Sequence, residues 1–355
     1  MSSSWASCTK NGWNKMETKI DINETLLDTN APATLNKGLS LRPAQWADLH
    51  AVAQLIYDVC EADGDTTVAV TPDELKLEWQ TPGFNIETDG IVVTTVDGRI
   101  AGYEEFTNES EHSKLRTDGY VHPKFKGRGI GTSMLCVIET RAREEIALVN
   151  PDVRVYLHSM MDSHDKDGRS IHEDAGYHPI RFHWRMQIDL EAPPVAVAWP
   201  EGIELRPFIK NEHNRAVWQA QNESFRDHWG SHDVPFERWE LGKFGRTDFD
   251  PTLWMIAWDG DQIAGFSQNR YRMGIGWIGT LGVCRPWRKR GLGEALLIHS
   301  FGEFYKRGTR TIGLGVDAEN PTGATRLYIK AGMHAASEFV TYEKELRPGR
   351  ELEQE

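Results

Sequence analysis

The stretch LGVCRPWRKRGLGEALLIHSF (281–301) predicts a strand, a turn and a helix in direct succession. An apolar run typical of a β-strand ends at Val283, and an amphipathic run typical of a helix begins near Gly293. Glycines let backbone N–H groups approach a ligand closely, and the N–H groups that open a helix attract anions. The turn also carries Arg288, Lys289 and Arg290. These residues predict an anion site that fits a pyrophosphate.

A related stretch occurs earlier in the chain, so the sequence repeats itself. VHPKFKGRGIGTSML (121–135) corresponds to VCRPWRKRGLGEALL (283–297), about 160 residues later. Three further pairs follow the same order at a similar offset: LSLRP (39–43) with IELRP (203–207), VDGRIAGY (96–103) with WDGDQIAGF (258–266), and EDAGY (173–177) with IKAGM (329–333). A period of this length is too long for a solenoid and indicates a duplicated domain.

Both copies predict the same series of elements. A strand ending in Leu-Arg-Pro leads into an amphipathic helix, a hairpin with Asp-Gly at its turn, the strand and helix around the glycine turn, and a further strand. The second copy adds a short helix and a last strand near 338–346. We expect an α/β (α+β) fold of two tandem domains, each with a mixed central sheet flanked by helices. The expected boundaries are a mobile tail at 1–36, an N-terminal domain at 37–190, a linker at 191–202 and a C-terminal domain at 203–347.

Composition narrows the classes of function. The net charge of −13 disfavours binding to nucleic acid or an anionic membrane, and it is compatible with a cationic substrate. The chain has no apolar run long enough to span a membrane, and its N-terminus lacks the apolar stretch of a signal peptide. We therefore expect a cytoplasmic protein. The cysteines show no zinc-ligand spacing and are expected to be free thiols: Cys8, Cys60, Cys136 and Cys284.

The turn also carries a family resemblance. Arg288-x-x-Gly291-x-Gly293 resembles the acyl-CoA signature of the GNAT superfamily of N-acetyltransferases, and Lys126-x-x-Gly129-x-Gly131 stands at the matching place in the first copy. A shifted register that starts at Arg290 also fits. Two alternatives are a glycine turn that merely packs a helix on a strand and a Rossmann dinucleotide site. The GxGxxG motif of a Rossmann site is absent, and neither copy has the GK[ST] that a Walker loop needs. The resemblance covers roughly 38–190 and 202–347.

The resemblance implies that acetyl-CoA is the cosubstrate and that no metal takes part. In the family, the pantetheine arm lies where the strand before the signature separates from its neighbour. In the second copy the resemblance assigns acetyl-CoA binding to Leu281, Gly282, Val283, Arg288, Lys289, Arg290, Gly291, Leu292, Gly293 and Asn320. In the first copy the corresponding residues are Val121, Lys126, Gly127, Arg128, Gly129, Ile130 and Gly131.

Candidate catalytic residues also lie in the second copy. NPTGATRLYIKAGM (320–333) resembles the family's segment in which a Tyr protonates the departing CoA thiolate, and this position is Tyr328. Asn320 fits the N-cap and Pro321 the first residue of the helix. The N–H of Leu281 is the candidate oxyanion donor. An alkyl ammonium must lose a proton before it attacks, and Glu223 is a candidate for this base, with Asp227 and His228 as candidates for acceptor binding.

The two copies are not equivalent in sequence. His172 stands at the position of Tyr328 and His164 at that of Asn320, and the helix position is preceded by a polar stretch with no clear cap-and-helix pattern (158–170). The first copy is therefore predicted to be degenerate or non-catalytic. The histidines of this region match no metal-ligand spacing, so we expect surface histidines and no metal.

These features predict an acetyl-CoA-dependent N-acetyltransferase that acts on a primary amine of a small molecule by direct attack on the thioester. A tandem arrangement with an active C-terminal half is similar to that of the mycothiol synthases, which acetylate a cysteinyl amine, so this acceptor is one alternative. A non-catalytic acyl-CoA sensor is another, although the presence of Tyr328 and Asn320 disfavours it. We expect a monomer or a homodimer with no nucleic-acid or membrane partner.

Overall fold

The computed structural model describes residues 35–231, 233–320 and 322–352, so nearly all of the predicted tail lies outside it. In the first copy the elements are β1 (Leu39–Pro43), α2 (Leu49–Ala62), α3 (Pro72–Trp79), α4 (Ile86–Asp89), β2 (Gly90–Thr95), β3 (Ile100–Ser110), β4 (Lys114–Val121), α5 (Ile130–Glu144), β5 (Val155–Asp162), α6 (Lys166–Asp174) and β6 (His178–Asp189).

The second copy repeats this order from residue 203 onward. Its elements are β7 (Ile203–Pro207), α7 (Asn214–Phe225), α8 (Phe236–Phe244), β8 (Trp254–Asp259), β9 (Gln262–Arg272), β10 (Ile275–Val283), α9 (Leu292–Lys306), β11 (Thr311–Asp317), α10 (Ala324–Lys330) and β12 (His334–Arg347). Short 3-10 turns are η1 (Trp46–Asp48), η2 (Thr66–Val68), η3 (Pro123–Phe125), η4 (Glu145–Leu148), η5 (Pro251–Leu253) and η6 (Arg285–Trp287).

Local sequence accounts for several of these elements. Helix α3 begins with a capping box, in which Thr71 and Glu74 satisfy each other's backbone N–H groups and Pro72 takes the first turn. The predicted hairpins form at their Asp-Gly turns, where Gly98 and Gly260 both have positive φ angles. The structure also contains α6, for which the sequence shows no pattern.

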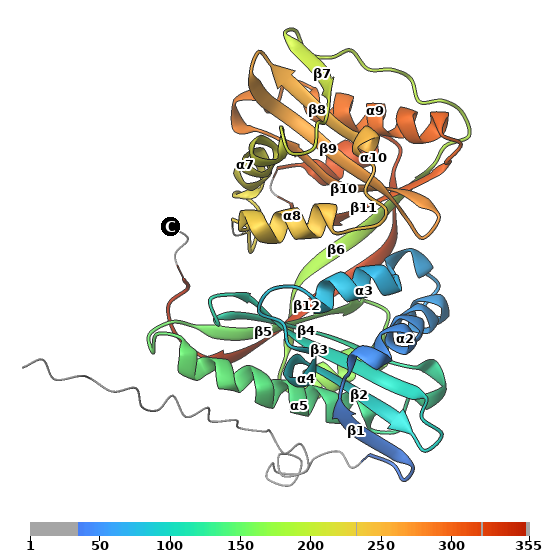
Figure 1. The fold of residues 1–355 in the computed structure, drawn as a ribbon, viewed down its shortest axis with the longest axis vertical. Coiled ribbons are helices and arrows are strands. Elements are labelled where there is room, and N and C mark those ends of the chain that lie inside the picture. The colour runs from blue at the N-terminus through green and yellow to red at the C-terminus, as the bar shows by residue number, and fades with distance from the viewer. Residues whose placement is uncertain (1–34, 232, 321, 353–355) are drawn as a thin grey trace, which may run out of the picture.

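A single mixed sheet of 12 strands connects the two copies, in the order β1-β2-β3-β4-β5-β12-β6-β11-β10-β9-β8-β7 (Figure 1). Its two halves mirror each other about the central pair of strands. In each half one pair is parallel, β4 with β5 and β10 with β11, and the neighbouring pairs are antiparallel. The predicted α/β fold with mixed sheets and flanking helices is thus confirmed.

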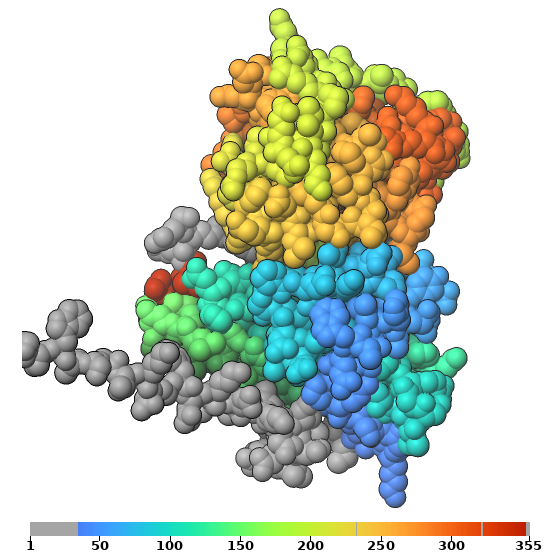
Figure 2. Space-filling view, viewed as in Figure 1, coloured from blue at the N-terminus to red at the C-terminus, as the bar shows by residue number. Residues whose placement is uncertain are grey.

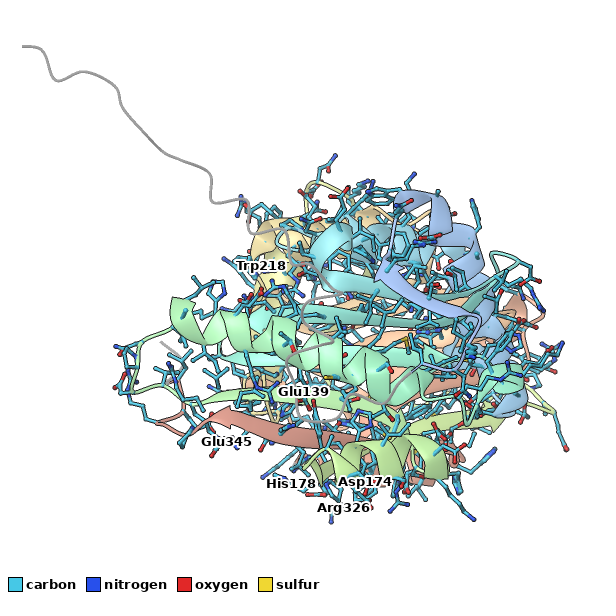
Figure 3. The ribbon with its side chains drawn as sticks, turned by 90° about the horizontal axis from the view of Figure 1, so that it is seen from below. Glu139, Asp174, His178, Trp218, Arg326 and Glu345 are labelled. Atoms are coloured by element: carbon cyan, nitrogen blue, oxygen red, sulfur yellow. The ribbon has the colours of Figure 1, made fainter. Side chains whose placement is uncertain are left out.

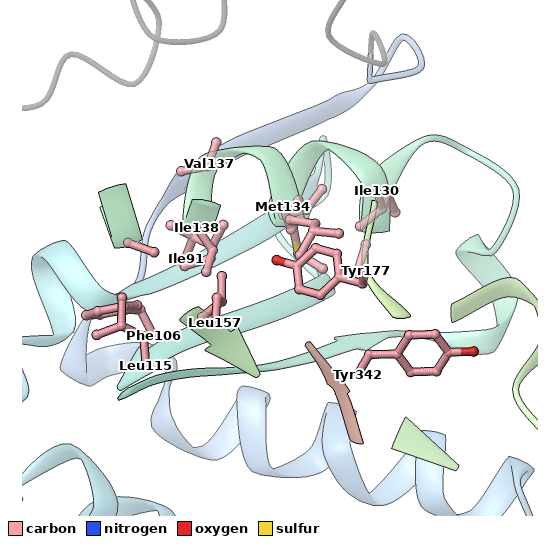
Figure 4. Packing of buried hydrophobic residues seen from close by; sticks show 14 of the residues in the cluster. Ile91, Phe106, Leu115, Ile130, Met134, Val137, Ile138, Leu157, Tyr177 and Tyr342 are labelled. Carbon is pink, nitrogen blue, oxygen red and sulfur yellow. The ribbon is translucent and has the colours of Figure 1, made fainter. Parts of the chain in front are cut away.

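The copies exchange their last strands. Strand β6, from the first copy, pairs with β11 and β12, while β12, from the second copy, pairs with β5 and β6. Met186 of β6 is fully buried in the hydrophobic core of the second half. Val340 and Tyr342 of β12 belong to the core of the first half, and Figure 4 draws Tyr342 together with other residues of that core. Each half of the sheet is therefore completed by the other copy.

Helices cover both faces of each half. The core beneath α5 fills one face of the first half, and that beneath α2 and α3 fills the other. In the second half α9 and α10 cover one face, and α7 and α8 cover the opposite one. Seen from below, α5 with Glu139 lies across the first half near β12, and Lys344 of β12 forms an ion pair with Glu139 at 2.6 Å (Figure 3).

The two halves meet where α8 approaches α3 (Figures 1 and 2). Arg246, which follows α8, and Arg270 of β9 bind one carboxylate of α3, that of Glu74, at 2.7 and 2.8 Å. Burial opposes ionisation of Glu74, but its hydrogen bond from the Thr71 backbone and the nearby arginines hold its pKa at about 2. Among the described residues, no helix is long and apolar enough to cross a membrane.

Candidate functional site

The predicted glycine turn lies between β10 and α9, and its backbone is shaped for an anion. Gly291 is the N-cap of α9 and has a φ of 84°, in the left-handed region that favours glycine. A Cβ at Gly291 would meet no atom within 4 Å, so open space lies in front of the helix end. The first N–H groups of α9 face outward without helical partners, as a bound phosphate requires.

The three cations of the turn point in different directions. Lys289 and Arg290 are exposed, and Lys289 has a φ of 62°, which is unusual for a residue with a side chain. Arg288 instead turns inward, where its guanidinium donates to the carbonyl oxygens of Val283 and Ser224. Lys289 and Arg290 are thus placed to attract a nucleotide phosphate, whereas Arg288 braces the turn from behind.

Strands β10 and β11 separate as the resemblance implies. Their parallel pairing consists of Gly276 with Ile312 and Trp277 with Gly313, and it ends there. The Cys284 N–H donates to Ala264 of β9, so the alternation of an antiparallel ladder turns the N–H groups of Leu281 and Val283 away from β9. These groups face the gap beside β11, where an unpaired strand edge can bind a peptide-like ligand.

The floor of this gap is open because glycines occupy it. The pairing of β9 with β10 shifts between Ile278 and Thr280, which makes Gly279 the extra residue of a β-bulge. Gly315 of β11 is exposed, and a Cβ there would meet nothing within 4 Å. Backbone groups on both sides of the gap are therefore accessible.

Tyr328 lies on α10, against the core beneath α9. Its side chain is buried with Ile278 and Leu297, and burial raises the pKa of its hydroxyl to about 12. The phenol is thus protonated at neutral pH, as a proton donor must be. None of the described residues forms a hydrogen bond with this hydroxyl, and no other cause shifts its pKa.

The start of this helix differs from the prediction. Helix α10 begins at Ala324 with Gly323 as its N-cap, not with Asn320. The Asn320 side chain instead accepts from the backbone N–H of Thr322 at 2.8 Å, which closes a local turn. Gly323 has a φ of 80°, which lies in the left-handed region that favours glycine. Because this conformation is not helical, the helix starts only at Ala324. The predicted first helical residue, Pro321, lies outside the described residues.

The three candidates for acceptor chemistry are brought near the end of β10. Glu223 of α7 accepts from the backbone N–H of Arg285 at 3.4 Å. Asp227 forms ion pairs with Arg285 and Arg288, both at 2.6 Å, and these guanidinium groups lower its pKa to about 2. Burial, with the nearby Arg288, lowers the pKa of His228. Asp227 therefore supports the glycine turn from the side of α7.

A cavity of about 190 Å³ on the α8 side contains polar groups that the sequence analysis did not select. Its lining includes Lys243 of α8 and Gln268 of β9, together with Trp254 and Trp277. Lys243 Nζ lies 3.1 Å from Thr280 Oγ1, one residue before Leu281. No sequence motif contains these residues, because α8 and β9 come together only in the folded chain. The lining also contains the charged residues Arg246, Asp248 and Arg270, so neither Lys243 nor Gln268 stands out in the sequence.

The first copy preserves the turn but not the rest of the site. Gly127 and Gly129 have φ angles of 75° and 76°, and α5 begins directly after them at Ile130. Strands β4 and β5 separate after Thr117, yet no bulge interrupts this part of β4. Turn residues Val121, Lys126, Arg128 and Gly131 also lie at the places corresponding to those of the second copy.

At the position of Tyr328 the first copy has His172, which lies in α6. Its Nδ1 lies 2.8 Å from the Gly168 carbonyl oxygen, and its Nε2 is buried without a partner in the part of the chain that the structure describes. Burial lowers its pKa. His164, in contrast, is exposed. Among the described residues, no group of three or more His, Cys, Asp or Glu side chains is arranged to hold a metal.

Comparisons with known proteins identify the family of this chain. Residues 214–333 match the acetyltransferase (GNAT) family. A mycothiol acetyltransferase of Kineococcus radiotolerans is 30% identical over 311 residues, which cover 83% of this chain and 93% of that protein. A mycothiol acetyltransferase of Nocardia farcinica is 25% identical over 305 residues, covering 82% and 92%.

Solved structures extend the likeness to the whole tandem arrangement. A GCN5-related N-acetyltransferase from Sphaerobacter thermophilus superposes with a TM-score of 0.75 and 36% identity, covering 91% of this chain and 100% of that one. A tandem GNAT protein from the clavulanic acid biosynthesis pathway has a TM-score of 0.67 at 16% identity, covering 88% and 100%, and shows a shared fold.

Proposed function

Because this chain belongs to the GNAT family of acetyltransferases and uses acetyl-CoA to acetylate amines, we propose that its C-terminal copy performs the reaction. The observation that carries this proposal is the open edge of β10, which runs into the glycine turn of α9. The family match at residues 214–333 falls on the same copy.

The residues of the second copy fit acetyl-CoA. Gly291 leaves room for a pyrophosphate at the start of α9, with Leu292 and Gly293 in the first helical turn, and Lys289 and Arg290 offer charge to phosphate groups. The N–H groups of Leu281 and Val283 that face away from β9 suit the amides of the pantetheine arm. Gly282 between them leaves room for the ring of Phe266, which a Cβ would meet at 2.6 Å. Acetyl-CoA supplies the activated acetyl group when it is bound.

Two groups of the chain then act on the thioester. The N–H of Leu281 stabilises the negative charge that develops on the carbonyl oxygen during attack. The hydroxyl of Tyr328 protonates the sulfur as the carbon–sulfur bond breaks, and its pKa of about 12 keeps the proton in place until then. Asn320 supports the loop before α10 and is a further candidate for contact with the cosubstrate.

We propose that the acceptor is a small molecule with a primary amine. A cysteinyl amine is the first acceptor to test, because relatives named mycothiol acetyltransferase match more than nine-tenths of their own length. Glu223 and His228 remain candidates near the acceptor, while Asp227 is proposed to act through Arg288 and the turn. We also propose that the protein works in the cytoplasm as a monomer or homodimer, and light scattering would measure its size.

Release of CoA from acetyl-CoA in the presence of an amine panel tests this function. The panel should include a cysteinyl amine, an aminoglycoside, a polyamine and a peptide N-terminus. We expect amine-dependent release with at least one small acceptor. An intact protein that binds acetyl-CoA by calorimetry and turns over none of them would instead be a sensor.

A further inference from the structure

Lys243 stands close to the reacting end of β10, on the side opposite Tyr328. It projects from α8 into the cavity described above, and its Nζ lies 3.1 Å from Thr280 Oγ1. Thr280 directly precedes Leu281, the proposed donor to the thioester oxygen. Tyr328, in contrast, packs with the core beneath α9 on the other face of the sheet. The two side chains therefore approach the gap between β10 and β11 from opposite faces.

Lys243 has no acidic partner among the described residues, although its neighbours are charged. The cations that act most strongly on the Lys243 ammonium are Arg270 of β9 and Arg246, which follows α8. The carboxylates of Glu74 and Asp248 bind those two arginines rather than the lysine. Burial, reinforced by both guanidinium groups, lowers the pKa of Lys243 to about 7, so a large share of it is a neutral amine at neutral pH.

A second observation indicates that this cavity is built for a polar ligand. Gln268 is 3% exposed, yet neither its Nε2 nor its Oε1 has a hydrogen-bond partner among the described residues. A buried amide without partners is costly, so native structures rarely retain one unless a ligand or water completes it. Gln268 lies directly across from Thr280 in the β9–β10 ladder and lines the same cavity as Lys243.

We propose that Lys243 is the base that takes the proton from the acceptor's ammonium group, while the Gln268 amide binds a hydrogen-bonding group of the same acceptor. This inference rests on the proposed function, because it assigns the base of that reaction. The cations around Lys243 also favour a neutral acceptor, since they repel an ammonium ion and so help it to lose its proton.

The proton inventory of the step balances. The neutral Lys243 amine accepts one proton from the ammonium, and the freed lone pair forms the carbon–nitrogen bond. The carbon–sulfur bond breaks, its electron pair stays on sulfur, and the thiolate takes the Tyr328 proton. The second proton lost by nitrogen restores the tyrosine through solvent, and Lys243 returns its own proton to water. The products are an N-acetyl amide, free CoA and one proton in solution.

The pH dependence of kcat/KM for the acceptor tests this assignment, with Lys243→Met and Lys243→Arg as variants. For an amine with a pKa near 10, the wild-type value should rise with pH up to about 7 and then level off. In both variants we expect a loss of about a hundredfold at pH 7, the low end for a general base, and a rise that continues toward the pKa of the acceptor. Lys306→Met, on the exposed face of α9, is the control and should match the wild type.

Further readouts separate this proposal from its rivals. Lys243→Met should keep acetyl-CoA binding and a melting temperature at least as high as the wild type, because it removes the cost of burying an ammonium. Gln268→Leu should raise KM for the acceptor and leave KM for acetyl-CoA unchanged. A normal pH profile in Lys243→Met, or its loss in Glu223→Gln instead, would overturn the assignment. Absence of turnover in the wild type would refute the proposed function before this step is reached.

Discussion

At the scale of single residues, the site uses burial in two opposite ways. Burial raises the pKa of Tyr328 and keeps its proton bound, while burial next to two arginines lowers the pKa of Lys243 to about 7, so that a large share of it is neutral at neutral pH. Each group is thus held in the form that its proposed step needs at neutral pH. The two side chains reach β10 from opposite faces of the sheet, so proton removal and proton donation are kept apart.

Tyr328→Phe tests the proposed acid. The ring keeps its packing and only the hydroxyl is lost, so the melting temperature should stay near that of the wild type. We expect kcat to fall about tenfold or more, with little change in KM for acetyl-CoA, because the contribution arises mainly in the transition state. Steady-state kinetics under conditions where chemistry limits the rate would measure this. His172→Phe in α6 is the control, and an unchanged kcat in Tyr328→Phe would assign the tyrosine to the core.

At the scale of elements, the exchanged strands make each half depend on the other. Strand β6 lies between β11 and β12, so the side of β11 away from the gap is paired by residues of the first copy. That pairing fixes β11 while β10 separates from it. The first copy therefore has a structural role in the second site, whatever it binds itself.

Met186→Ala measures this dependence. Met186 is fully buried among second-copy residues such as Leu314, although it comes from the first copy's last strand. Truncation should cost about 2–5 kcal/mol of stability, as for other buried Met→Ala changes. Chemical denaturation followed by circular dichroism gives the value. Val340→Ala on β12 is the matched change in the opposite direction. If one half of either variant unfolded at the denaturant midpoint of the wild type, the halves would not depend on each other.

At the scale of the whole molecule, a small cluster of charges joins the copies. Glu74 of α3 neutralises both Arg246 and Arg270 across the interface, and these arginines in turn set the environment of Lys243. The first copy thereby influences the charge of the cavity that contains Lys243 in the second. A change in α3 should reach the chemistry through electrostatics even though no residue of α3 touches the reacting atoms.

Glu74→Gln tests this coupling. The pKa of Glu74 is about 2 instead of 4.5, so its contribution to stability is complete above pH 4.5 and is lost as the pH falls toward 2. The variant should lose about 2–3 kcal/mol at neutral pH and show less acid sensitivity. With Asp248 left as the carboxylate beside Arg246 and Arg270, the two arginines should also lower the pKa of Lys243 further and move the rise in kcat/KM to lower pH. Identical stability and pH profiles in the variant and the wild type would contradict the coupling.

The sequence was sufficient for the features that local chemistry determines. The repeated turn, its glycines and the following helices have a fixed local pattern, and the same pattern locates the strand that opens beside β11. The strand exchange could not be predicted, because β6 and β12 each pair equally well with either copy by pattern alone. The start of α10 was misplaced, since Asn320 closes a turn of its own and Gly323 takes the cap. Lys243 and Gln268 acquire their properties from burial between α8 and β9, which no spacing reveals.

The central claim is that the reaction occurs in the second copy, and matched changes in the two turns test it most directly. Gly293→Glu and Gly131→Glu each place a negative side chain in the first turn of the helix that follows the glycine turn, at backbone angles without a positive φ. Amine-dependent CoA release should collapse in Gly293→Glu, because the carboxylate repels the pyrophosphate, and it should stay near the wild-type rate in Gly131→Glu. Equal losses in both variants, or a greater loss in Gly131→Glu, would contradict the account.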